Sequence, residues 1–210
     1  MRQTHSAAGS HWETVYATCA EWELSWQQEY PALSLEFIKA LCPDQTGRIL
    51  DVGGGDSNLV DHLLEAGYQH LTVLDISEGA LHRAQGRLGP KAGRVRWLAA
   101  DITQPRELGP REVWHDRAVF HFLTRPGDRA AYVAQAAQTV VSGGGLLVAT
   151  FALDGPEYCS GLPVCRYDAE SLTAEFADAF EAVRRERETH VTPWGASQEF
   201  VYVAFRRRGA

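Results

Sequence analysis

The sequence predicts one α/β domain: a doubly wound, mainly parallel seven-stranded sheet with helices on both faces and an antiparallel last strand. Between residues 48 and 151, short apolar runs alternate with segments of helical periodicity, an order typical of parallel strands joined by helices. The link between the last two expected strands, 182–190 and 199–206, is too short for a crossover helix, so these strands should pair antiparallel. A chain of 210 residues is long enough to bury such a core.

The beginning of the chain is rich in aromatic side chains, and its apolar spacing predicts helix. We expect residues 1–44 to form a helical arm that either packs as a layer or acts as a lid over a pocket. The aromatic residues of the arm are Trp12, Tyr16, Trp22, Trp26 and Tyr30.

The following elements alternate between strand and helix. Ser77 should cap the helix after the second strand, and Asp56 or Ser57 the helix after the first. The apolar face of residues 130–141 predicts a helix that the glycines at 143–145 end. A last helix is expected over 169–180. The core strands are expected at residues 48–52, 70–75, 95–99, 113–119 and 146–151.

The final strand should be covered on both sides, because its two faces are both apolar. One face carries Phe200, Tyr202 and Ala204. The opposite face carries Val201, Val203 and Phe205.

Composition excludes several classes of protein. The net charge of −7 argues against a nucleic-acid partner. No apolar stretch approaches the ~20 residues of a membrane span, and the N-terminus lacks an apolar signal-peptide core, so we expect a cytoplasmic protein without a membrane partner. No Cys-x-x-Cys pair occurs, and we expect no metal site. The sequence sets no oligomeric state.

A glycine turn follows the first strand and leads into a helix, in the order Asp51-Val52-Gly53-Gly54-Gly55. Glycines at such a turn let a ligand lie against the backbone and allow a positive φ. Asp75 ends the second strand, where a carboxylate can accept hydrogen bonds from both hydroxyls of a ribose. The turn and the acid together predict a nucleoside-binding site at the carboxyl ends of the strands.

Two cofactors compete for this site. A dinucleotide needs G-x-G-x-x-G, but the third glycine position holds Asn58, and Asp51 and Asp56 would repel a pyrophosphate. The same acids favour the cationic amino-acid part of S-adenosylmethionine. The residues therefore favour S-adenosylmethionine over NAD, and a nicotinamide dehydrogenase is the disfavoured reading.

Segments 50–55, 73–77 and 100–102 resemble the first three motifs of class I S-adenosylmethionine-dependent methyltransferases. The resemblance implies a Rossmann-like methyltransferase fold, with the cofactor-binding core over 45–151 and an acceptor loop, a helix and terminal strands over 152–210. It also implies that Asp51 lines the methionine part, Asp75 holds the ribose, and Ile76 and Asp101 meet the adenine. The expected cofactor-binding residues are Trp26, Asp51, Gly53, Gly55, Asp75, Ile76, Asp101, Ile102 and His115.

A finer resemblance concerns the acceptor. Asp116-Arg117-Ala118, residues 126–129 and the arm around Trp26 are similar to the thiopurine and thiol methyltransferase branch. This likeness implies a small-molecule acceptor, with a thiol or another soft nucleophile as the expected group. Protein-lysine methyltransferases have a similar acid-basic-small triplet and are the alternative; a non-catalytic S-adenosylmethionine-binding protein is the second alternative.

His115 and Asp116 are the candidate catalytic residues, because they end the fourth strand near the expected reactive methyl group. Either could orient or deprotonate an acceptor. The competing interpretation is that His115 satisfies a backbone carbonyl and Asp116 pairs with Arg117. Cys159 and Cys165 share a long loop that could line the acceptor pocket.

Overall fold

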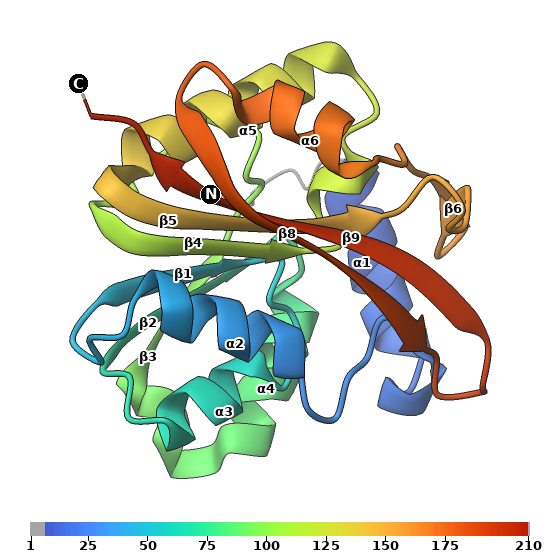
Figure 1. Cartoon of the computed structure of the whole chain (residues 1–210). Helices are drawn as coiled ribbons and strands as arrows, with labels where there is room; N and C mark the ends of the chain where they lie inside the picture. The colour runs from blue at the N-terminus through green and yellow to red at the C-terminus, as the bar shows by residue number, and fades with distance from the viewer. Residues whose placement is uncertain (1–6, 210) are drawn as a thin grey trace.

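The computed structural model describes residues 7–209, and the statements below refer to that part of the chain. Seven strands form one sheet in the order β3-β2-β1-β4-β5-β9-β8 (Figure 1). The five strands β3, β2, β1, β4 and β5 are parallel, and β9 pairs antiparallel with both β5 and β8. The predicted doubly wound sheet with an antiparallel finish is therefore confirmed.

The helices cover both faces of this sheet: α2, α3 and α4 lie on one side, and α5 and α6 on the other (Figure 1). The helices are α1 (Ala7–Thr18), α2 (Ala32–Leu41), α3 (Leu59–Glu65), α4 (Glu78–Leu88), α5 (Pro126–Thr139) and α6 (Ala169–Phe176). The strands are β1 (Arg48–Val52), β2 (His70–Asp75), β3 (Val95–Ala99), β4 (Arg111–Arg117), β5 (Val140–Phe151), β6 (Tyr158–Cys159), β7 (Leu162–Pro163), β8 (Phe180–Val191) and β9 (Ser197–Arg207). Short 3-10 turns lie at Glu21–Glu23, Gly89–Arg94 and Phe120–Phe122.

The core consists of two apolar layers separated by the sheet. Strand β9 contributes to both: Phe200, Tyr202 and Ala204 lie in the layer beneath α2 and α3. Val201, Val203 and Phe205 lie in the layer beneath α5 and α6. The prediction that both faces of the last strand are covered is confirmed. No helix among residues 7–209 has the length and apolar character needed to cross a bilayer.

Several boundaries differ from the sequence prediction, and three of the differences concern where an element ends. Strand β4 ends at Arg117, not at residue 119, because the Asp116 carboxylate accepts hydrogen bonds from Val119 N (2.9 Å) and Phe120 N (3.1 Å) and Ala118 adopts a φ of 71°. The glycines at 143–145 do not end a helix; α5 ends at Thr139 and β5 begins at once with Val140. Helix α6 stops at Phe176, because β8 already starts at Phe180.

The two predicted caps have different outcomes. Ser77 caps α4, its hydroxyl accepting from Ala80 N at 3.1 Å. The N-cap position of α3 is Asn58, and neither Asp56 nor Ser57 occupies it. Ser57 still contributes, because its hydroxyl accepts from Leu59 N at 3.1 Å. Asp56 makes other contacts, described below.

The proposed division into arm, core and acceptor region stays a prediction. The first six residues of the arm lie outside the described part of the chain. Over the rest, α1 lies beside α4 and reaches the carboxyl ends of the strands (Figure 1).

Candidate active site

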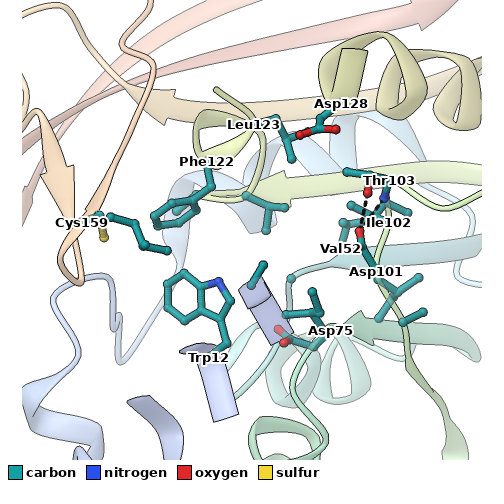
Figure 2. Close-up of a pocket in the computed structure, with 18 of the residues that line it drawn as sticks. Trp12, Val52, Asp75, Asp101, Ile102, Thr103, Phe122, Leu123, Asp128 and Cys159 are labelled. Carbon is teal, nitrogen blue, oxygen red and sulfur yellow. Dashed lines mark hydrogen bonds between the residues drawn. The ribbon is translucent and has the colours of Figure 1, made fainter. Parts of the chain in front are cut away.

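A cavity of about 460 Å³ opens at the carboxyl ends of β1, β2 and β4. Its floor includes Val52, Gly53, Leu74 and Ala118. The side chains of the arm cover it, and the turn after β4 and the β6–β7 hairpin close one end (Figure 2). The cavity therefore lies where the glycine turn and the acidic strand end predicted a ligand.

Asp75 lies in the wall of the cavity and is only 5% exposed. One carboxylate oxygen accepts a hydrogen bond from Ser77 N at 2.8 Å. Burial raises the pKa of Asp75 to about 7, and the nearby charges of Asp51 and Glu13 act in the same direction. A ligand that donates hydrogen bonds to such a buried carboxylate would stabilise its ionised form.

The neighbouring wall combines apolar side chains with a second acid. Ile76 and Ile102 line the cavity together with Asp101 and Thr103. Asp101 Oδ1 accepts from Thr103 N (2.9 Å) and Thr103 Oγ1 (2.6 Å), which fixes the turn after β3 (Figure 2). Both of these hydrogen bonds use Oδ1, and the Asp101 side chain lines the cavity.

The glycine turn provides room in two different ways. Gly53 has a φ of 66° and lines the cavity, and a Cβ there would lie 1.9 Å from Val119 Cγ2. Gly55 does not line the cavity. Its φ is 42°, and a Cβ would lie 2.7 Å from the Tyr16 hydroxyl and 2.9 Å from Asp75 Oδ2. Gly55 thus makes space for Tyr16 and Asp75 to approach the turn.

His115 belongs to a buried hydrogen-bonded chain. Its Nδ1 lies 2.7 Å from Asp51 Oδ1, and its Nε2 lies 2.9 Å from Ser34 Oγ. All three residues border a small second cavity of about 30 Å³, which adjoins the first at Gly53, Trp26 and Arg117. Both ring nitrogens of His115 are thus engaged within the protein, which holds the ring and Asp51 in fixed positions beside the second cavity.

Asp116 is fully buried and does not line either cavity. Besides its two backbone donors, its carboxylate accepts a hydrogen bond from Tyr132 Oη at 2.5 Å. Burial raises its pKa to about 6. The geometry gives Asp116 the task of shaping the turn after β4, and it does not pair with Arg117 as the competing interpretation supposed.

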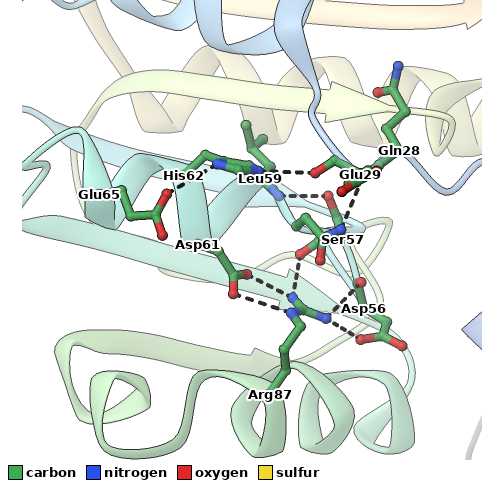
Figure 3. Close-up of polar contacts among 10 residues, drawn as sticks. Gln28, Glu29, Asp56, Ser57, Leu59, Asp61, His62, Glu65 and Arg87 are labelled. Atoms are coloured by element: carbon green, nitrogen blue, oxygen red, sulfur yellow. Dashed lines mark hydrogen bonds and ion pairs between the residues drawn. The ribbon is translucent and has the colours of Figure 1, made fainter.

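Asp56 points away from the cavity, which corrects part of the argument for the cofactor. Arg87 of α4 holds it at 2.5 Å and also contacts Asp61 at 2.9 Å (Figure 3). The charge of Asp56 is therefore compensated within the protein. Of the two acids expected to act on the ligand, only Asp51 borders a cavity.

Aromatic side chains form the other end of the main cavity. Trp12 meets Trp26 and Phe122 edge-on, with ring centroids 5.7 and 5.0 Å apart. Tyr16 packs on Trp26 at 6.3 Å, also edge-on. The sequence singled out the aromatic arm, but it gave no reason to choose Phe122, which follows β4 in a 3-10 turn.

Arg117 connects the two cavities, since it lines both. Its Nε donates to Tyr202 Oη (2.8 Å), and its Nη1 donates to the Trp26 carbonyl (2.9 Å). Its Nη2 is buried without a hydrogen-bond partner among the described residues, 3.6 Å from the carboxylate of Glu188. The guanidinium group thus lies between the two cavities, with its Nη2 facing the Glu188 carboxylate.

The two loop cysteines separate in space. Cys159 lines the cavity (Figure 2) and is buried, which raises the pKa of its thiol to about 11. Cys165 lies outside the cavity lining, near Arg129. Residues 7–209 contain no group of three or more His, Cys, Asp or Glu side chains arranged to hold a metal ion.

Comparisons with known proteins agree with this geometry. Residues 49–144 match the family model described as "Methyltransferase domain". The chain is 25% identical over 150 residues to the eEF1A lysine and N-terminal methyltransferase of Danio rerio, which covers 70% of this chain and 21% of that protein. The protein of the same description from Mus musculus is 27% identical over 97 residues, 46% of this chain and 14% of that one. The chain spans about a fifth or less of the length of these relatives.

Solved structures share the fold at low sequence identity. An S-adenosylmethionine-dependent methyltransferase from Anabaena variabilis superposes with a TM-score of 0.76 at 14% identity, covering 99% of this chain and 98% of that one. The 1,6-didemethyltoxoflavin-N1-methyltransferase of Burkholderia thailandensis, with bound S-adenosylhomocysteine, gives 0.72 at 18% identity, covering 96% and 88%. The N-methyltransferase NodS of Bradyrhizobium japonicum, in complex with S-adenosylhomocysteine, gives 0.67 at 17%, covering 97% and 100%.

Proposed function

We propose that this chain, a class I S-adenosylmethionine-dependent methyltransferase, methylates a small molecule at a thiol or another soft nucleophile. The observation that carries the proposal is the division of the cavity (Figure 2). Asp75, Asp101 and Asp128 lie on one side, and the opposite end is formed by Trp12, Phe122 and Cys159. A cofactor with a polar nucleoside and an apolar acceptor would suit the two sides.

The residues present fit the cofactor. Asp75 would accept hydrogen bonds from the ribose hydroxyls, and Ile76 and Ile102 would pack on the adenine. The methionine part would lie along the backbone of Gly53, near the guanidinium group of Arg117, because both residues line the cavity. When bound, this cofactor supplies a methyl group on a positively charged sulfur, which an aligned nucleophile displaces in line.

The aromatic end of the cavity contains no group suited to removing a proton, as far as residues 7–209 define it. Cys159 stays a thiol at neutral pH because its pKa is raised to about 11. Both nitrogens of His115 are engaged, and Asp116 lies outside the cavity. An acceptor that ionises by itself near neutral pH, or that attacks through a free lone pair, needs no such group. Thiols, with an ordinary pKa of about 8.5, meet this condition better than alcohols or protonated amines.

A protein lysine is the second candidate acceptor, because the relatives from Mus musculus and Danio rerio are described as lysine and N-terminal methyltransferases. A lysine ammonium must lose a proton before it can attack, and an acid near the methyl group would assist its binding. The acids in the cavity wall lie on the nucleoside side instead. The geometry therefore supports the small-molecule acceptor over the lysine.

The test is transfer from labelled cofactor to matched acceptors. The full chain is incubated with thiols and with alcohols and amines of the same carbon skeletons, and S-adenosylhomocysteine release is measured. The Cys159→Ser variant serves as a control, because it removes the cavity thiol as a possible methyl acceptor. We expect thiols to be methylated fastest by both forms.

A parallel incubation with cell lysate distinguishes the alternatives. Label in a protein band with the thiols untouched would contradict the proposal and favour the lysine acceptor. Tight binding of S-adenosylhomocysteine in calorimetry, with no transfer to any acceptor, would indicate the non-catalytic alternative. Binding of NAD more tightly than S-adenosylhomocysteine would contradict the cofactor assignment itself.

A further inference from the structure

A separate groove, distinct from the two cavities described above, lies at the opposite edge of the sheet, at the amino ends of the strands. Its volume is about 390 Å³, and it crosses β3, β2, β1 and β4. The basic side chains that line it are Arg48, His70, Arg94, Arg96 and Arg111. The cofactor cavity lies at the carboxyl ends of the same strands, so no residue is shared between the two.

The register of the strands explains why these side chains come together. Arg48 pairs directly with His70, and Thr72, on the same strand as His70, pairs with Arg96. Arg111 begins β4, the next strand on the other side of β1. Because neighbouring strands lie about 4.8 Å apart, the row from β3 to β4 is about 14 Å long.

The positive charge of this row is largely uncompensated by the protein. None of the described residues that line the groove is acidic. Glu112 pairs with Arg48 at 2.5 Å and so neutralises one member. Arg94 and Arg96 make no ion pair with any acid in the described part of the chain, although the protein as a whole carries a net charge of −7.

Arg111 provides a second, independent observation. It is only 6% exposed, and its Nε is buried without a hydrogen-bond partner among the described residues. One Nη2 donor is used by the Leu108 carbonyl at 2.7 Å. Burial lowers the pKa of Arg111, the nearby charges of Arg96 and Arg48 lower it further, and the charge of Glu112 acts in the opposite direction. A buried cation facing like charges is unfavourable unless an anion offsets it.

We propose that this groove binds a small molecule carrying more than one phosphate group, with Arg94, Arg96 and Arg111 as its main ligands. The planar guanidinium groups offer paired donors that match phosphate oxygens. A row of this length suits two or more linked phosphates better than a single ion. The volume lies within the usual range of about 300–1,000 Å³ for small-ligand sites.

The probe is inorganic pyrophosphate, titrated into the full chain by calorimetry at constant ionic strength. The exposed Arg96 is changed to alanine, and Arg94 separately, because neither change should disturb folding. The matched control is Arg185→Ala, which removes an exposed arginine from β8 at the edge of the same sheet. We expect each groove variant to weaken pyrophosphate binding by about tenfold, with Arg185→Ala unchanged.

The same samples are titrated with S-adenosylhomocysteine, and its affinity should be equal in all four proteins. That readout separates this proposal from the proposed function, since loss of cofactor binding in every sample would concern only the latter. Equal pyrophosphate affinity in the wild type and both groove variants would overturn the proposal. So would an equal response to sodium sulfate at the same ionic strength, or binding limited to long polyanions such as heparin.

Discussion

At the scale of single residues, buried charge decides what the site can hold. Asp51 is hydrogen-bonded to His115, and Asp56 forms an ion pair with Arg87, within the folded chain. Among residues 7–209, Asp75 accepts from the backbone N–H groups of Ser77 and Ile76 and forms an ion pair with no cation. The pKa of Asp75 is raised to about 7, because burial disfavours its ionised form and no cation compensates for that effect among the described residues. Of the acids around the glycine turn, Asp75 therefore has most to gain from a ligand.

Replacing Asp75 by alanine should weaken binding of S-adenosylhomocysteine by about 1.5–3 kcal/mol, the range for hydrogen bonds to a charged group. The fold should persist, because the change removes a buried acid and leaves the Ser77 cap of α4 intact. Calorimetry measures the affinity, and circular dichroism checks the fold. Asp178→Ala, an exposed acid after α6, is the control. Unchanged affinity in a folded Asp75 variant would contradict the assignment of this residue to the ribose.

Gly53 and Gly86 form a matched pair for testing the turn. An alanine at position 53 would collide with Val119 and would adopt a left-handed backbone, which alone costs about 1–2 kcal/mol. Gly86 lies in α4 with open space around it, so its change to alanine should stabilise the protein by about 0.5–1 kcal/mol. Urea unfolding measures both. If Gly53→Ala were as stable as the wild type, the close approach at Val119 would not matter.

At the scale of elements, the position of α1 over the cavity depends on α4. Glu13 of α1 accepts hydrogen bonds from Glu78 N (2.5 Å) and Gly79 N (3.4 Å), at the N-terminus of α4. A carboxylate is favourable there because it meets unsatisfied backbone donors and the positive end of the helix dipole. Arg83 of α4 in turn donates to the carbonyls of Tyr16 and Cys19. These contacts attach the aromatic cover of the cavity to the sheet.

We expect Glu13→Ala to loosen this cover. Loss of a helix N-cap interaction is worth about 1 kcal/mol, so the affinity for S-adenosylhomocysteine should fall about fivefold, mainly through faster dissociation. Stopped-flow release of the ligand measures the rate. Glu181→Ala, at an exposed position on β8, is the matched control. Equal dissociation rates in the two variants would show that α1 does not retain the ligand.

The sequence predicted element boundaries best where a strand coincides with a run of apolar residues. Strands β1, β2 and β3 begin and end where the apolar runs do. The end of β4 could not be predicted from the strand's own sequence, because the Asp116 carboxylate turns the chain through hydrogen bonds to backbone N–H groups three and four residues later. The partner of Asp56 was equally hidden, since Arg87 is 31 positions away and reaches it only through the packing of α4. The place of Phe122 in the cavity wall was hidden too, because it depends on the turn that the chain makes after β4.

At the scale of the whole molecule, the arrangement of acids that suits a ligand lowers the stability of the ligand-free fold. The carboxyl ends of the strands converge on one edge, which places Asp51 and Asp75 near Glu13 in a partly enclosed space. The unfolded chain would leave these acids in water. The folded, ligand-free protein must therefore hold the charge of Asp75 in an unfavourable place, and the bound ligand is what compensates for it.

This effect predicts how Asp75→Asn should change stability with pH. Because the folded pKa of about 7 lies above the unfolded value near 4, the folded state binds the Asp75 proton more tightly than the unfolded state. The contribution of Asp75 to stability is therefore greatest below about pH 4 and is lost as pH rises through 7. Other groups titrate in both proteins alike, His121 and Asp116 among them.

The difference in free energy of unfolding between Asp75→Asn and the wild type should thus increase in favour of the variant from pH 5 to pH 8. Urea unfolding across this range, without ligand, measures that difference, and Asp178→Asn should show none. Saturating S-adenosylhomocysteine should reverse the order at pH 8, because only the wild type offers an ionised acceptor to the ribose. A difference that stays constant with pH would mean that Asp75 is ionised at no cost in the folded protein, and that its isolation from cations has no energetic consequence.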